Sequence, residues 1–502
     1  MILLNSVFVE TVITFSVFLV LVWYAYYSYC FNYWRKRGVP SHPPDFPTGN
    51  ITKAVLGKEN LFNSVENFYH EFKKKGYRHA GLYFFNGPVY LPIDTDIVKA
   101  ILTTDFEYFV DRGSFIDETE FPLSGHLFSI TGMKWKNLRN KLLPTFSTAK
   151  LKSMYEIFQK NTESFMECVE QVANKGTDLN IKYAATNFTA DIISSTALGI
   201  EAGTLKNPDN EISKITFRMF NPPLWLYLKL VLLDGFQNPG NIIKVTHCDR
   251  KVEDFFKHLV SKIMNHRENS QLIRKDFMSL LLEIKKKEGL SFEEILSQTF
   301  LFFLAGFETS SQTIAFAIHA LAHQPDLQDK LRGEIFKNMG KDFRKYSYEE
   351  VLKLPYLDKV FNETLRLYPV LGFLNRICVK PYKVPGTDVT IEKGTPVLIS
   401  TLGLQRDPDY YPDPLKFDPE RFDESGSTVP FSFLPFGEGP RICIGKRYGI
   451  LQAKLGIAAL ISQFKFSPSP QTPPFVEFDK LSTSLAMTPS KGVTVRVEKL
   501  KF

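Results

Sequence analysis

An uncharged and largely apolar run lies near the N-terminus, at residues 11–34. It is long enough to cross the ~30 Å hydrocarbon core of a bilayer as a helix. Aromatic residues crowd its C-terminal half, and Arg35, Lys36 and Arg37 follow at once, as is typical of a membrane interface. A secretory signal peptide is the alternative, but its basic residues would come first and its apolar run would be shorter. We therefore expect a membrane anchor at residues 1–34, with the rest of the chain in the cytosol.

A proline-rich stretch follows the anchor. Pro40, Pro43, Pro44 and Pro47 predict a stiff and extended spacer. The expected organisation is thus an anchor at residues 1–34, a basic and proline-rich linker at residues 35–50, and one large folded domain at residues 51–502.

Hydrophobic periodicity in the large domain is mainly helical. Residues 80–93 read as two short strands around the turn Asn86-Gly87, but helical patterns dominate beyond residue 130. Residues 292–323 are apolar on almost every side, as expected of a helix through the middle of a large protein. Residues 217–236 are apolar but too interrupted to span a bilayer, which favours core packing. Alternation after Gln463 predicts strands, so the expected fold class is mainly α with smaller β sheets (α+β) and one N-terminal transmembrane helix.

Composition narrows the function classes. The chain has 502 residues, is 44% hydrophobic and 14% aromatic, and carries a net charge of +7, which fits a globular protein with acidic partners or an anionic membrane surface. The chain has no lysine-rich or arginine-rich tract of the kind that would suggest nucleic-acid binding. The five cysteines are odd in number, far apart and without a C-x-x-C pair, which argues for a reducing compartment and against a zinc site or a disulfide framework.

One cysteine lies in an unusual setting, Phe436-Gly-Glu-Gly-Pro-Arg-Ile-Cys-Ile-Gly445. The glycines allow tight turns and a close approach of the backbone to a flat ligand. A helical pattern begins directly afterwards, so the thiol of Cys443 lies before a helix N-terminus, where we expect its pKa to be lowered. Such a thiolate suits a metal ligand, and a thiolate ligand to haem iron favours O–O cleavage. The alternative is a buried structural cysteine.

Two helical segments carry further candidate chemistry. Trp135 and Arg139 are four residues apart on one helix face, where both can reach one acidic group. In the long apolar helix, Ala305 and Gly306 leave space, while Glu308 and Thr309 offer a carboxylate and a hydroxyl for proton delivery. Ordinary core packing is the alternative for both segments.

Two other pairs are weak signals alone. Glu363 and Arg366 form an i, i+3 ion pair. His319 and His323 lie at i, i+4, but no third metal ligand accompanies them, so we interpret them as two helix histidines with hydrogen-bond partners.

Together these motifs resemble the cytochrome P450 family of haem-thiolate monooxygenases. The pattern Phe436-x-x-Gly-x-Arg-x-Cys443-x-Gly matches the family's haem-binding signature at every fixed position, and residues 305–310 match its oxygen-activation motif. The resemblance implies haem b (iron protoporphyrin IX) bound by Cys443 and a proton relay through Glu308 and Thr309. It also implies cofactor contacts from Arg112, Trp135, Arg139, Arg376, Phe436 and Arg441, and a structural triad of Glu363, Arg366 and Arg421.

The resemblance also implies a substrate cavity. Residues 217–236 correspond to the family's cavity roof, which touches the membrane. The remaining walls are expected to be apolar and to accept lipophilic small molecules; the candidate lining residues are Phe115, Phe128, Phe302, Phe303, Ala305, Val370, Phe373 and Leu485.

The implied activity is oxidation of lipophilic small molecules with dioxygen and NADPH-derived electrons. The residues in and around these motifs look most like those of insect microsomal members that clear foreign compounds, including plant toxins and insecticides. This resemblance implies a location in the endoplasmic reticulum membrane. No nicotinamide or flavin fingerprint is present, so electrons are expected from NADPH-cytochrome P450 reductase, with cytochrome b5 as a second possible donor. We expect an acidic reductase to dock on a basic face of Lys134, Lys136, Lys141, Lys446 and Arg447.

Three alternatives stay open. The enzyme could oxidise an endogenous lipophilic substrate such as a hormone or fatty acid. A haem-thiolate isomerase or dehydratase would need Cys443 but neither dioxygen nor Thr309, and a non-catalytic haem sensor would share the fold.

Overall fold

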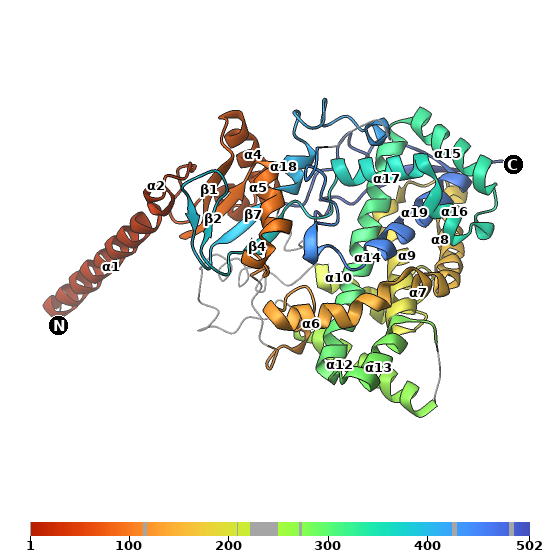
Figure 1. Ribbon diagram of the computed structural model, residues 1–502, viewed down its shortest axis with the longest axis horizontal. Coiled ribbons are helices and arrows are strands. Elements are labelled where there is room, and N and C mark those ends of the chain that lie inside the picture. The colour runs from red at the N-terminus through yellow and green to blue at the C-terminus, as the bar shows by residue number, and fades with distance from the viewer. Residues whose placement is uncertain are drawn as a thin grey trace.

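The computed structural model describes residues 2–113, 118–207, 209–220, 249–270, 274–423, 429–480 and 486–502. Helices form most of this part of the chain, and the strands form small sheets. Helix α1 projects from the body as a single rod, the largest sheet lies next to it, and most helices gather on the far side of that sheet (Figure 1). The predicted fold class, mainly α with smaller β sheets, is confirmed.

The helices are spread along the whole chain. In the first half of the chain they are α1 (Ile2–Cys30), α2 (Tyr33–Lys36), α3 (Thr52–Val55), α4 (Leu61–Lys74), α5 (Thr95–Lys99), α6 (Gly132–Leu142), α7 (Thr148–Ser153), α8 (Tyr155–Lys175), α9 (Ile181–Ile193) and α10 (Glu211–Phe220). The later ones are α12 (Arg250–Ser270), α13 (Phe277–Glu288), α14 (Phe292–Ala322), α15 (Pro325–Met339), α16 (Tyr348–Lys353), α17 (Pro355–Leu367), α18 (Thr401–Gln405) and α19 (Lys446–Gln463).

The strands form three sheets among the described residues. The largest has the order β1-β2-β7-β4, made of β1 (His79–Phe84), β2 (Gly87–Pro92), β7 (Pro396–Ile399) and β4 (Leu374–Ile377). Strands β1 and β2 form the predicted hairpin. The second sheet, β3-β9-β8, consists of β3 (Leu179–Asn180), β9 (Thr494–Lys499) and β8 (Phe464–Ser467), which confirms strands after Gln463. The third is the hairpin of β5 (Tyr382–Lys383) and β6 (Thr390–Ile391).

Helix α14 is the axis of the helical lobe. Ser291 and Glu294 cap its N-terminus by bonding to each other's backbone N–H, which defines where the helix begins. It packs against α9, α17 and α19. Its apolar composition would also suit a membrane span, but 72% of its most apolar window is buried inside the protein, whereas none of the corresponding window of α1 is. Helix α14 is therefore a core helix, and α1 is the candidate membrane anchor.

The anchor helix ends earlier than the sequence suggests. Helix α1 stops at Cys30, and Trp34 is fully buried in the domain. The Trp34 indole N–H donates to the carbonyl of Leu82 (2.8 Å), and its backbone N–H donates to the Tyr83 hydroxyl (3.0 Å). Glycine at position 81 is required because a Cβ there would overlap the indole ring. Trp34 thus belongs to the domain rather than to the membrane segment.

Residues of the expected linker also pack against the sheet. The Gly81 N–H donates to the Pro40 carbonyl (2.8 Å), and the Phe85 N–H donates to the Thr48 carbonyl (3.1 Å). Asn50 pairs with Tyr83 through both backbone and side chain. The proline-rich stretch is therefore hydrogen-bonded along the β1–β2 hairpin and is not a free spacer.

Candidate active site

The segment that carries Cys443 is a tightly turned loop before α19, and we call residues 434–445 the cysteine loop. Gly437 and Gly439 have φ of +70° and +74°, which only glycine adopts readily. A Cβ at Gly439 would also overlap the carbonyl oxygen of Leu102. The Cys443 N–H donates to the Phe436 carbonyl (3.0 Å), which closes the loop. The glycines of the pattern are therefore needed for the turn itself.

The thiol of Cys443 faces a cavity of about 940 Å³ between the cysteine loop and α14. Burial raises the pKa of this thiol, although the Gly445 N–H and the charges of Arg112, Arg139 and Lys446 oppose that effect. The expectation of a lowered pKa is wrong for the chain alone because desolvation outweighs the helix N-terminus. A bound cation reverses this balance, because metal coordination deprotonates a thiol outright.

Four guanidinium groups gather beside the thiol: Arg112, Arg139, Arg376 and Arg441. Burial and the nearby charges of Arg376 and Arg441 hold the pKa of Arg112 well below its ordinary value. Burial, followed by the charge of Arg376, lowers the pKa of Arg441 to about 9. Burial lowers the pKa of Arg376 to about 10. Within the described residues, the carboxylate that pairs with these four is Asp111, at 3.7 Å from Arg441.

These four arginines are fixed mainly by backbone carbonyls. Arg441 donates to the carbonyls of Val110 (2.8 Å) and Ile130 (2.9 Å), and Arg139 donates to Ile442 in the cysteine loop (2.8 Å). The Arg441 guanidinium also lies 4.2 Å from the centre of the Trp135 ring. The arginines therefore hold the loop and the preceding segment together around Trp135.

The arrangement fits a flat, dianionic cofactor. The Nε of Arg376 is buried and has no hydrogen-bond partner among the described residues. The guanidinium donates to the Asn375 carbonyl (2.8 Å), so Nε is its unpaired donor, and a buried N–H without a partner is costly. An anionic ligand would relieve both that cost and the mutual repulsion of the arginines. The two carboxylates of a haem group would satisfy this cluster, and Cys443 would bind its metal. Phe436, which is partly buried, lines the same side of the cavity.

The opposite wall comes from the middle of α14. The Thr309 hydroxyl donates to the Ala305 carbonyl one turn earlier (2.8 Å), a bond that threonine commonly forms within helices. Ala305, Gly306, Glu308 and Thr309 all line the cavity. The hydroxyl and the carboxylate proposed for proton delivery are therefore across the cavity from the thiol.

Glu308 has a partner that the sequence analysis missed. Its carboxylate is buried and pairs with the ammonium of Lys182 on α9 (3.0 Å), while Gln312 donates to its other oxygen (2.8 Å). Lys182 also donates to Ser311 (3.1 Å) and Thr186 (2.8 Å). The one available signal was a lysine in the otherwise uncharged first half of α9, but no periodicity links positions 182 and 308.

The expected structural triad comes together behind the cysteine loop. Glu363 and Arg366 are fully buried and form two hydrogen bonds, of 2.6 and 2.8 Å. The Arg421 guanidinium lies 3.6 Å from Glu363. Arg366 also donates to the carbonyls of Gln405 and Pro414, both at 2.8 Å. These contacts join α17 to the segment that precedes the cysteine loop.

The expected cavity walls are only partly those observed. Phe128, Phe302, Ala305, Val370 and Phe373 line the cavity. Phe303 does not, because the next position on α14 turns its ring toward Phe256 and Phe307, where it is fully buried. Phe115, Leu485 and residues 221–236 of the expected roof lie outside the described residues.

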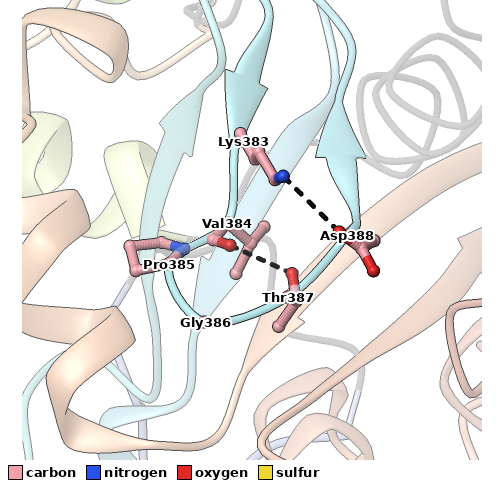
Figure 2. Close-up of a pocket in the computed structure, with 6 residues that line it drawn as sticks. All are labelled: Lys383, Val384, Pro385, Gly386, Thr387 and Asp388. Carbon is pink, nitrogen blue, oxygen red and sulfur yellow. Dashed lines mark hydrogen bonds and ion pairs between the residues drawn. The ribbon is translucent and has the colours of Figure 1, made fainter.

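The remaining candidates show no second reaction centre. His319 and His323 both bond to the carbonyl of Pro473, at 2.8 and 3.1 Å, and no cluster of three or more potential metal ligands occurs in the part of the chain that the structure describes. A separate hollow lies at the β5–β6 hairpin loop, where Lys383 pairs with Asp388 at 3.5 Å (Figure 2). It shares no lining residue with the Cys443 cavity.

Comparison with known proteins agrees with this geometry. The family model described as "Cytochrome P450" matches residues 43–495. The chain is 38% identical to "Probable cytochrome P450 6a23" of Drosophila melanogaster, over 93% of this chain and 95% of the relative. It is 36% identical to "Cytochrome P450 6a2" of the same species (94% and 96%) and 34% identical to "Cytochrome P450 6k1" of Blattella germanica (94% and 94%). Because the family model matches most of the chain and the relatives are covered almost end to end, the chain belongs to the cytochrome P450 family and is similar to insect members of it.

Proposed function

We propose that this P450 monooxygenase oxidises lipophilic foreign compounds, using dioxygen and electrons that a partner reductase takes from NADPH. The observation that carries the proposal is the cavity itself: one wall presents the thiol of Cys443, and the opposite wall presents Thr309 and Glu308. Membership of the family implies haem, and the residues beside Cys443 suit it. When bound, haem supplies the electron-transfer and oxygen chemistry.

In this proposal the cysteine loop and its neighbours bind and orient the cofactor. Cys443 would be the metal ligand, and Arg112, Arg139, Arg376 and Arg441 would neutralise the cofactor carboxylates, with Trp135 against the guanidinium groups of Arg139 and Arg441. Phe436 would form part of the wall of the cofactor site. The buried triad of Glu363, Arg366 and Arg421 holds the loop in position but touches neither cofactor nor substrate.

Thr309 and Glu308 are the proposed proton-delivery residues. In the resting arrangement the Thr309 hydroxyl donates a hydrogen bond to the Ala305 carbonyl. Its oxygen can therefore accept a hydrogen bond from the cavity side, and it becomes a donor to the cavity only after the hydroxyl rotates. Glu308 is ion-paired with Lys182 and bonded to Gln312. The two residues are adjacent on α14 and both line the cavity, so a carboxylate held by an ion pair and a rotatable hydroxyl are available at the same wall for directed proton transfer.

The cavity lining supports lipophilic substrates. Phenylalanine, leucine, valine and isoleucine from several elements make up half of its lining residues. Charged residues lie near Cys443, at α10 and around the start of α12, and also at Glu308 and Lys480. Apolar pockets of this size bind drug-sized molecules by removing their surface from water. A broad apolar wall favours a range of foreign compounds over one substrate with many polar groups.

Membrane attachment and reductase docking complete the proposal. Helix α1 would anchor the enzyme in the endoplasmic reticulum membrane, and the catalytic domain, which includes Trp34 and the proline-rich stretch packed on the sheet, would lie on the cytosolic side. Lys136, Lys446 and Arg447 are exposed near the cysteine loop, whereas Lys134 already pairs with Glu118 and Lys141 with the Glu288 carbonyl. The three exposed cations are therefore the better candidates for docking an acidic reductase, or cytochrome b5.

The test is turnover by the purified enzyme with NADPH-cytochrome P450 reductase and a panel of lipophilic compounds, under labelled dioxygen. The proposal predicts NADPH consumption and one labelled oxygen atom in the product. Conversion without NADPH consumption would instead identify an isomerase or dehydratase, and compound binding without conversion would identify a sensor. Preference for a hormone or fatty acid over all foreign compounds would identify an endogenous role.

Reductase docking has its own test. Lys446→Glu should raise the apparent KM for reductase, and high salt should do the same to the wild type, because both weaken charge pairing. Lys465→Glu, at an equally exposed lysine on β8, serves as the control. Equal KM values for all three proteins at low and high salt would exclude this docking face.

A further inference from the structure

Gln405, at the C-terminal end of α18, is a fully buried side chain between α17 and the start of the cysteine loop. Its side-chain amide donates to the carbonyls of Leu365 (2.8 Å) and Arg366 (3.2 Å), where α17 ends. Its side-chain oxygen accepts the backbone N–H of Leu434 (3.0 Å). One side chain therefore connects the end of α17 to the first residue of the cysteine loop.

Two further bonds carry this connection to Cys443. The Gly437 N–H donates to the Leu434 carbonyl (3.0 Å), which closes the turn at the start of the loop. The Cys443 N–H donates to the Phe436 carbonyl within that turn (3.0 Å). The position of the Leu434 peptide thus determines where the Phe436 carbonyl lies, and that carbonyl holds the backbone of Cys443.

The triad reaches the same residue from the other side. Arg366 donates to the backbone carbonyl of Gln405 (2.8 Å), so the Glu363–Arg366 pair fixes the main chain from which the Gln405 side chain extends. Replacing the Gln405 side chain leaves this backbone bond in place. A substitution at Gln405 therefore separates the loop connection from the triad.

The contacts of Gln405 are costly to lose. Its three partners are backbone groups in a fully buried region, and leaving a buried peptide N–H or carbonyl without a partner costs more free energy than its hydrogen bond contributes. The Leu434 N–H, at the start of the cysteine loop, has the Gln405 side-chain oxygen as its acceptor. If that acceptor is removed, we expect the cysteine loop to move so that the Leu434 N–H finds another partner.

We propose that Gln405 is a positioning residue for Cys443: it transmits the rigid geometry of α17 to the cysteine loop and so keeps the thiolate on the metal. The proposal rests on the role of Cys443 as the haem ligand. Gln405 touches neither cofactor nor substrate, and its effect is on the persistence of the sulfur–metal bond.

The test compares two buried glutamines that both bond to backbone groups of neighbouring elements. Gln328 donates to the carbonyls of Leu321 (3.0 Å) and Phe466 (2.9 Å) and accepts the Phe466 N–H (2.9 Å), but it joins α15 to β8. It also accepts from the Arg332 guanidinium (2.8 Å), so its loss should be at least as costly as that of Gln405. Methionine nearly matches glutamine in volume and cannot make these bonds. Gln405→Met and Gln328→Met holoproteins are therefore a matched pair of variants.

The readout is the red-shifted Soret band of reduced, carbon monoxide-saturated protein, which reports the thiolate ligand, measured alongside far-ultraviolet circular dichroism during mild heating. Gln405→Met should lose the band about tenfold faster than the wild type while its helicity is unchanged. Gln328→Met should lose band and helicity together. Equal behaviour of the two variants would overturn the proposal.

A second measurement needs no variant, in case Gln405→Met does not accumulate. In native-state hydrogen exchange of the wild-type holoprotein, the Leu434 amide should exchange as slowly as the amides of α17. The reason is that its acceptor is the buried side chain of Gln405, which is itself bonded to carbonyls of α17. Fast exchange at Leu434 would contradict the proposal. A wild type without the Soret band would overturn the assignment of Cys443, and this proposal with it.

Discussion

At the scale of single residues, the carboxylate of Glu308 depends on Lys182. Removing one partner of a buried ion pair leaves an uncompensated charge and costs about 3–5 kcal/mol. Lys182→Met should therefore lower the apparent Tm by several degrees, as measured by circular dichroism of the purified holoprotein. The double variant Lys182→Met/Glu308→Gln carries no buried charge at this site and should recover most of the loss. A double variant less stable than the single one would contradict the ion-pair account.

His319 gives a prediction about pH. Burial lowers the pKa of His319 to about 4, against 6.5 ordinarily. Below about pH 6.5 the unfolded chain therefore binds a proton at the His319 imidazole, whereas the folded chain binds it only below about pH 4. The free energy of unfolding should fall as pH decreases through this window, by at most about 1.4 kcal/mol per pH unit.

The His319→Gln variant isolates that effect. Glutamine keeps a donor for the Pro473 carbonyl but does not titrate, so the pH dependence of the apparent Tm between pH 6.5 and 4 should become shallower. His323→Gln removes the neighbouring imidazole that bonds to the same carbonyl, and it is the control. An unchanged slope in His319→Gln would refute the assignment.

The residues that could be predicted from sequence are those in short motifs. Cys443, Thr309 and the Glu363–Arg366 pair each lie where the motif implies. Lys182 and Gln405 were not predicted, because each acts through a partner more than 25 positions away, and hydrogen bonds between distant backbone and side-chain atoms leave no periodic signal. Phe303 was placed in the cavity wrongly because one step along a helix changes the face by about 100°.

At the scale of elements, the cysteine loop depends on Gly439. Its φ of +74° and its contact with the Leu102 carbonyl both exclude a side chain. Gly439→Ala should therefore displace the loop and yield protein with little thiolate-bound haem, measured by the Soret band of the carbon monoxide complex. Gly289→Ala is the control, because Gly289 has nearly the same φ (+72°) in the left-handed region but nothing within 4 Å.

The two glycine variants distinguish the effect of backbone strain from that of a steric clash with the Leu102 carbonyl. Gly289→Ala introduces only the strain of the left-handed backbone, about 1–2 kcal/mol, and should keep the band at full intensity. Full intensity in Gly439→Ala as well would show that the loop can move away from Leu102 without losing its ligand.

Helices and strands with strong periodicity were predictable, including α14, α19 and the β1–β2 hairpin. The packing of residues 35–50 was not, because proline content predicts an extended chain but not what that chain pairs with. The hydrogen bonds from Gly81 and Phe85 to this segment come from the hairpin, which is remote in sequence.

At the scale of the whole molecule, we propose that Trp34 makes the junction between anchor and domain a rigid joint. The indole is fully buried and bonded to Leu82, directly before the trypsin sites at residues 35–37. Trp34→Ala should open this junction, so trypsin should cleave the liposome-embedded protein there about tenfold faster or more, because cleavage requires local unfolding. Phe18→Ala, in the exposed middle of α1, should be cleaved like the wild type. Equal rates for all three would indicate a flexible tether.

We assign the Cys443 thiolate as the ligand of haem iron. Its test is the absorption spectrum of the reduced, carbon monoxide-saturated protein beside that of Cys443→Ser. We expect the red-shifted Soret band in the wild type and its complete absence in a Cys443→Ser protein with wild-type circular dichroism. A wild type without the band, or a serine variant that keeps it, would exclude Cys443 as the ligand.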